Sequence, residues 1–146
     1  FQQGYSIFLP ARMDAKGIPN EQIKVADLGY KPYSTLFVSQ KTIDENPEMV
    51  QEVVNRLRAA FVKSLNNPKP TMDLILSKSK KTTPAIHMNA IELMKAEFLP
   101  EDYSKLGCMK SARWEELAGQ LKEVEVVPSD FDPSNSYNLS FMGNCE

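Results

Sequence analysis

The sequence predicts an α/β fold, because two segments with the pattern of β-strands precede at least three segments with the pattern of amphipathic helices. Residues 23–28 alternate apolar and polar side chains, which is typical of a half-buried strand. Residues 33–39 are rich in β-branched and aromatic side chains, which favours a more buried strand. Since two strands alone do not make a stable sheet, we expect further strands to come from another segment or another chain.

The helix predicted over residues 47–65 has the clearest signals. Asn46 is a good N-cap residue, and Pro47 suits the first helical position, where no amide donor is needed. The Asn-Asn-Pro sequence at 66–68 predicts the end of this helix. Six apolar side chains recur at helical spacing and predict one apolar stripe, namely Val50, Val53, Val54, Leu57, Phe61 and Leu65.

Three further helices are predicted after it. A short helix is expected from Thr71 to Leu76, and another begins after the Thr83 cap. A helix that starts at Ser111 carries Trp114, which we expect in the core. The tail from Pro128 is rich in Asp, Pro, Ser and Asn and is predicted to be irregular. The helix that follows Thr83 has five apolar side chains on one face, Ile86, Ala90, Ile91, Met94 and Phe98.

The composition is that of an ordinary globular domain, with 146 residues, 42% hydrophobic and 25% charged. The net charge of -2 gives no reason to expect a nucleic-acid partner. No apolar run reaches the roughly 18 residues of a membrane span. No signal-peptide pattern is visible from Phe1 onward, so we expect the chain to be a processed or excised segment.

Two cysteines, Cys108 and Cys145, fit neither a metal-ligand spacing nor a thioredoxin-type pair. They form either one disulfide near the C-terminus, which an oxidising compartment permits, or two free and partly buried thiols. The sequence leaves both alternatives open.

Several short motifs occur in an order that is informative as a set. They include Val-Ala-Asp-Leu-Gly at 25–29, the segment Tyr33–Val38 and Asp-Glu-Asn-Pro-Glu-Met-Val at 44–50. The set resembles the solute-binding proteins of ABC importers for nitrate, sulfonates, taurine and thiamine pyrimidines, and it covers nearly the whole chain. Further motifs that match this family's pattern are Arg58–Phe61, Asn67–Pro68, Gly107–Met109 with Trp114, and Ser136–Asn138.

The resemblance implies the C-terminal part of a type II periplasmic binding protein fold. Residues 1–32 would end the second lobe, residues 33–39 would be the hinge strand, and residues 40–146 would be the helical part that returns to the first lobe. It implies a non-enzymatic protein that needs no cofactor and holds a sulfonate, nitrate or an aromatic or pyrimidine-like molecule between two lobes. The expected partners are an ABC permease in the membrane and the remainder of the binding-protein chain, and the expected location is periplasmic or extracellular, with a membrane anchor before this segment as one option.

The resemblance also implies four ligand-binding residues. It places Gly4, Tyr5 and Leu9 in a loop that faces the cleft, and Tyr33 at the hinge. A phenol combines an apolar face with a polar tip and suits contact with a ligand, although ordinary packing is the alternative for both tyrosines. Relatives that bind amine-bearing pyrimidines often have Glu where Leu9 stands, so Leu9 argues against a cationic or pyrimidine-like ligand.

Two other functions remain open from the sequence. One is enzymatic, since a fold relative in fungi makes the thiamine pyrimidine from its own histidine and pyridoxal phosphate. That relative carries a cysteine-rich iron motif with no counterpart here, and no catalytic or metal-binding set can be assembled around His87, the only histidine. The other is a helical interaction module, whose amphipathic helices cover a partner chain. We expect no catalytic residue and no metal ligand.

Overall fold

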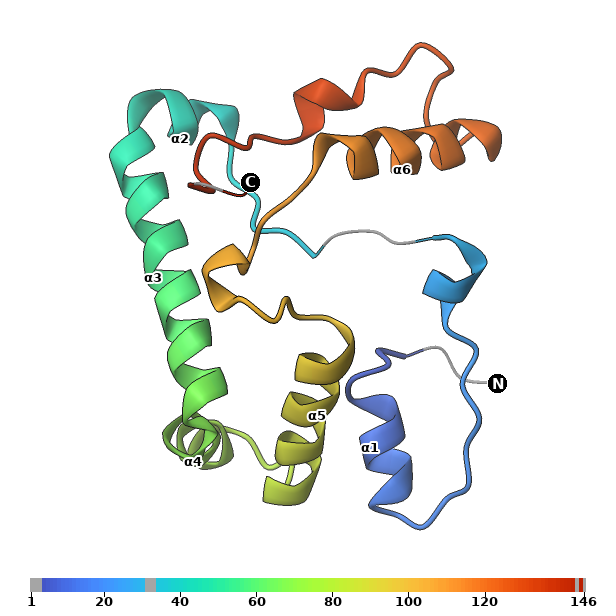
Figure 1. Ribbon diagram of the computed structural model, residues 1–146, viewed down its shortest axis with the longest axis vertical. Helices are drawn as coiled ribbons and strands as arrows, with labels where there is room; N and C mark the ends of the chain where they lie inside the picture. Colours follow the sequence, from blue (N-terminus) through green and yellow to red (C-terminus); the bar gives the residue numbers. More distant parts are fainter. Residues whose placement is uncertain (1–3, 31–33, 144, 146) are drawn as a thin grey trace. The chain divides into compact units, whose positions relative to one another are not determined.

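The computed structural model describes residues 4–30, 34–143 and 145, and every regular element within these ranges is helical (Figure 1). The predicted α/β fold class, a type II periplasmic binding fold with a hinge strand, is therefore wrong for this chain, because the described residues contain no strand and no sheet. The first predicted strand is largely the short 3-10 helix η1 (Val25–Leu28), and residues 34–38 form neither helix nor strand. A strand needs a neighbour to pair its backbone groups, and the described residues provide none.

The chain divides into two compact units. Unit 1 contains Phe1–Lys24 and Leu57–Leu106, and unit 2 contains Val25–Arg56 and Gly107–Glu146. The longest helix, α3 (Pro47–Asn66), contributes its first half to unit 2 and its second half to unit 1. The division predicted from the resemblance, at residues 32 and 39, stays a prediction.

Unit 1 is built around α5 (Pro84–Glu97), which packs against α1 (Leu9–Asp14) and α4 (Pro68–Lys78) (Figure 1). Thr83 caps α5 as predicted, because its hydroxyl oxygen accepts a hydrogen bond from the amide of Ile86 at 3.3 Å. The helix predicted at 71–76 is present as α4, which is longer than expected at both ends. The short helix α1 was not predicted. The short 3-10 helix η2 (Tyr103–Lys105) follows α5. The buried side chains of this unit are Pro10, Ala11, Leu65, Ala90 and Ile91.

Unit 2 contains η1, α2 (Gln40–Glu45), the first half of α3, α6 (Ser111–Glu123) and η3 (Pro133–Ser136). Trp114 on α6 stacks on Tyr137 beside η3, with ring centroids 5.3 Å apart, which ties the irregular tail to the helix. The amide of Gln120 donates to the carbonyl of Gly29 at 3.0 Å and holds the segment after η1 against α6. The amide of Gln51 donates to the carbonyl of Phe141 at 3.0 Å and links α3 to the tail.

The two cysteines form a disulfide within unit 2. The Cα atoms of Cys108 and Cys145 lie 5.6 Å apart, and the residues are separated by 37 positions. Of the two alternatives that the sequence left open, the structure has the bonded one. Closing a loop of this length stabilises the folded state by about 4 kcal/mol on the chain-entropy account.

Few apolar side chains are buried in either unit. The chain exposes 11154 Å², whereas a folded monomer of 16.5 kDa exposes roughly 7,600 Å². The difference is larger than the roughly 1,600 Å² that a standard protein–protein interface buries. Much apolar surface is thus left in water. The hydrophobic residues buried among the described ones are Ala11, Val50, Leu65, Ala90, Ile91, Ala118 and Met142.

Candidate functional site

Three of the four residues predicted to bind a ligand lie together at the start of unit 1. The carbonyl of Tyr5 accepts hydrogen bonds from the amides of Phe8 and Leu9, at 3.1 and 3.0 Å, and closes the turn that precedes α1. A Cβ atom at Gly4 would lie 2.7 Å from Cδ2 of Leu9, so a larger residue at this position would require the Leu9 side chain to shift. The side chain of Tyr5 is 80% exposed. The fourth residue, Tyr33, lies outside the described residues.

This turn presents a phenol and apolar side chains, and no residue from 4 to 9 carries a charge. Because Tyr5 is not packed, its ring is available for stacking and its hydroxyl for hydrogen bonding. Such a surface contacts a ligand by shape and polarity, since it has no ionic group to offer. The charge of an anionic ligand would need to be neutralised by other groups.

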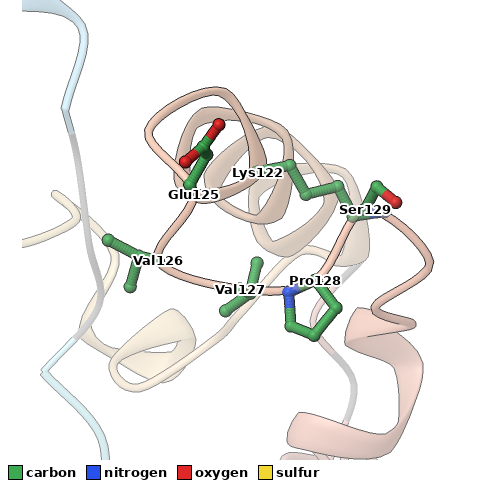
Figure 2. A pocket seen from close by; sticks show the side chains of 6 residues that line it. All are labelled: Lys122, Glu125, Val126, Val127, Pro128 and Ser129. Carbon is green, nitrogen blue, oxygen red and sulfur yellow. The ribbon is translucent and has the colours of Figure 1, made fainter.

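Two open depressions lie on unit 2. The larger, of about 580 Å³, is formed around the C-terminal end of α6 and the segment that follows it (Figure 2). Figure 2 shows the side chains of Glu125 and Val126 pointing away from each other. The smaller, of about 410 Å³, is lined by residues 45–49. Ligand sites are usually concave and bury most of the ligand, which neither depression does. The larger is lined by Lys122, Glu125, Val126, Val127, Pro128 and Ser129.

The shape of the larger depression follows from the way α6 ends. The amide of Val126 donates to the carbonyl of Leu121 at 2.9 Å, and the amide of Glu125 donates to that of Lys122 at 3.0 Å. These two bonds are those of a Schellman motif, in which the residue at the Glu125 position has a positive φ. Glu125 has φ 57°, a conformation that glycine adopts at lower cost. The depression is therefore explained by helix termination.

Two carboxylates have a lowered pKa, and both are helix caps. Hydrogen bonds from the hydroxyl and the amide of Ser104 lower the pKa of Asp102, which caps η2. Hydrogen bonds from the amide and the hydroxyl of Ser134 lower the pKa of Asp132, which caps η3. Both carboxylates are exposed, so the shifts reflect local capping and do not indicate acid–base chemistry.

His87 lies on α5 and is half buried. Its Nε2 atom is buried and has no hydrogen-bond partner among the described residues. Within the same residues, no group of three or more His, Cys, Asp or Glu side chains could hold a metal ion. The helices that the structure describes include none that is both long and apolar enough to span a membrane.

An exposed row of apolar side chains lies on α3, and three of its four members belong to the apolar stripe predicted from the sequence. We name Met49, Val53, Leu57 and Phe61 the α3 stripe; they are 52, 42, 43 and 50% exposed. They recur every four residues of one continuous helix, so their alignment follows from helical geometry alone.

The α3 stripe divides the single stripe predicted from the sequence. Val50 and Leu65 are buried at 6 and 4%, whereas Val53, Leu57 and Phe61 face water. Met49, four residues before Val53, was not part of the predicted stripe. It extends the apolar arc to a side of the helix that the described residues do not cover. A helix with this arc needs a partner on more than one side.

Comparison with known proteins gives no family for this chain. No family model matches it, and neither curated proteins nor solved structures gave a significant match.

Proposed function

We propose that this chain is the helical part of a solute-binding protein of an ABC importer, and that its α3 stripe packs against the remainder of that protein. The α3 stripe is the observation that carries the proposal. Full burial of a large apolar side chain is worth about 2 kcal/mol, so covering four half-exposed ones would stabilise the protein by about 4 kcal/mol. Exposed apolar rows of this kind mark interaction surfaces.

Three further features support a solute-binding role. The ordered motifs between residues 25 and 138 resemble those of ABC-importer binding proteins. The turn at residues 4–9 offers an unpacked phenol to a ligand. The Cys108–Cys145 disulfide favours a periplasmic or extracellular location, where such proteins work.

The proposed mechanism is closure over a small solute, driven by contacts that exist only in the closed form. An ABC permease would then read the closed, loaded form. Leu9 removes the carboxylate that a cationic ligand would favour, so a sulfonate, nitrate or an aromatic anion is the preferred ligand class. Because residues 4–9 carry no charge, basic groups elsewhere in the protein would neutralise the anion.

A helical interaction module is the second candidate, and the absence of an enclosed pocket around the two depressions favours it. In that case the α3 stripe would cover a partner protein and no solute would be involved. The two functions differ in whether a small molecule binds to the assembled protein.

Calorimetry on the protein purified from cells that express its own gene tests the proposal. We expect saturable binding of at least one of an alkyl sulfonate, nitrate and an aromatic carboxylate. Tyr5→Ala should weaken that binding at least tenfold, whereas Tyr103→Ala, a control in η2 of the same unit, should not change it. No binding across the panel, together with a stable protein complex, would favour the interaction module.

A further inference from the structure

Asn138, Leu139 and Ser140 form the acceptor sequence for N-linked glycosylation, which is Asn-X-Ser with X other than proline. No other asparagine of the chain has Ser or Thr two positions later, and Asn135, for example, has Tyr137 there. An Asn-X-Ser triplet is short enough to occur by chance. The structure around Asn138 therefore decides whether the triplet suits an acceptor.

Asn138 is exposed, and only one end of its side-chain amide is hydrogen bonded. The carbonyl oxygen, Oδ1, accepts a hydrogen bond from the amide of Ser140 at 2.9 Å and another from its hydroxyl at 2.7 Å. The nitrogen, Nδ2, has no hydrogen-bond partner within the part of the chain that the structure describes. An N-linked glycan is attached to Nδ2, so the triplet engages the oxygen and leaves the acceptor atom available.

The triplet lies in an irregular segment that is held on unit 2 from both sides. Before it, the ring of Tyr137 stacks on the ring of Trp114. After it, the carbonyl of Phe141 accepts a hydrogen bond from Gln51. Residues 138–140 between these contacts are all exposed. Because a glycan is bulky and needs water around it, attachment at this place would displace neither contact.

The disulfide of the same unit points to the compartment in which this modification occurs. The Cys108–Cys145 bond persists in an oxidising compartment, which a chain reaches by export across a membrane. N-linked glycans are found on surface loops of exported proteins. The disulfide and the exposed triplet thus indicate the same route for the chain.

We propose that Asn138 is an N-glycosylation site. The co-reactant is a lipid-linked sugar diphosphate, which the exporting membrane supplies together with a transferase. The bond between the anomeric carbon of the sugar and the phosphate oxygen breaks, and a bond between that carbon and Nδ2 forms. The lipid diphosphate leaves with the electron pair, and one proton of Nδ2 passes to the transferase. The inference goes beyond the proposed function, because it requires export of the chain and no solute binding.

Mass spectrometry of the protein purified from cells that express its own gene tests the proposal. After reduction and digestion with trypsin, residues 123–146 form one peptide, because no Lys or Arg follows Lys122. We expect this peptide to carry carbohydrate, and fragmentation should place the carbohydrate on Asn138. A peptide without carbohydrate, or carbohydrate on a serine hydroxyl, would overturn the proposal.

Four variants of the native protein test whether the triplet directs the modification. Asn138→Gln removes the acceptor, and Ser140→Ala removes the hydroxyl, so each should abolish the carbohydrate. Ser140→Thr keeps a hydroxyl and should retain it. Asn135→Gln is the matched control, since Asn135 is also exposed and lies three residues earlier, and it should leave the carbohydrate unchanged. Carbohydrate that persists in Ser140→Ala, or that Ser140→Thr fails to restore, contradicts the assignment.

The outcomes for this site and for the proposed function are separable. A native protein that binds a solute but carries no glycan on Asn138 overturns the glycosylation site alone. A native protein that carries the glycan and binds no solute of the panel counts against the proposed function alone.

Discussion

Leu57 and Leu65 offer a matched test of the α3 stripe, because the same substitution removes the same atoms from two positions of one helix in unit 1. Leu65 is 4% exposed and Leu57 is 43% exposed. In the 146-residue chain, Leu65→Ala should lower the free energy of unfolding by about 3 kcal/mol, the usual range for buried leucines. Leu57→Ala should lower it by about 1 kcal/mol, because much of that side chain is already in water.

The difference between the costs of the two substitutions should disappear in the protein purified from cells that express its own gene. If further polypeptide covers the α3 stripe, Leu57→Ala should then cost about as much as Leu65→Ala, roughly 3 kcal/mol. Urea unfolding followed by circular dichroism measures the free energy of unfolding in both forms of the protein. The dependence of this free energy on urea concentration should be the same for each variant, because it reports the surface area exposed on unfolding. Equal costs of the two substitutions in the isolated chain would refute the reasoning, because the α3 stripe would already be packed.

Three further predictions concern unit 2. Replacing both Cys108 and Cys145 by serine should lower its free energy of unfolding by about 4 kcal/mol, measured by urea unfolding without reductant; a loss below about 1 kcal/mol would show that the loop adds little. Glu125→Gly should raise that free energy by about 0.5 to 1 kcal/mol in the same assay, since glycine adopts the positive φ with less strain, and a decrease would contradict this account of the Schellman motif. Hydrogen bonds from Ser134 lower the pKa of Asp132 in the folded state. The stabilisation that the ionised Asp132 cap provides should therefore be complete above about pH 4, the unfolded pKa, and be lost as the pH falls through the lower pKa of the folded state. Asp132→Asn should remove that part of the acid dependence, and an identical pH profile for the variant would refute the cap.

Capping signals predicted the helices well. Pro47 and Thr83 each begin a helix where expected, and the Asn-Asn-Pro sequence at 66–68 separates α3 from α4. These signals depend on interactions within a few residues of the helix end, so they can be recognised from the sequence alone. The short helix α2 was missed, although Ser39 caps it by accepting the amide of Thr42 at 3.2 Å, because it has only six residues and little periodicity.

Strand patterns were misleading for a physical reason. Residues 23–28 and 33–39 have side chains that suit a sheet, but a strand forms only where a second strand pairs with it. In the predicted ligand site, Gly4, Tyr5 and Leu9 lie close together, because hydrogen bonds within one turn hold them there. Whether this turn binds a ligand stays a prediction.

The sequence also did not predict which side of α3 faces the core. Periodicity showed that the helix has an apolar arc, but it could not show which part of the arc the chain itself covers. Val50 and Leu65 are buried, and the α3 stripe is not, although all are apolar and at helical spacing. This choice depends on contacts between residues far apart in the sequence.

Two methionines allow the most direct test of the claim that the α3 stripe is uncovered in this chain and covered in the functional protein. Met49 is 52% exposed and Met142 is 8% exposed, so hydroxyl-radical footprinting with mass spectrometry compares them within one sample. In the 146-residue chain Met49 should oxidise much faster than Met142, and in the protein purified from cells its rate should fall to that of Met142. A slow rate for Met49 in the isolated chain, or an unchanged fast rate in the native protein, would contradict the account.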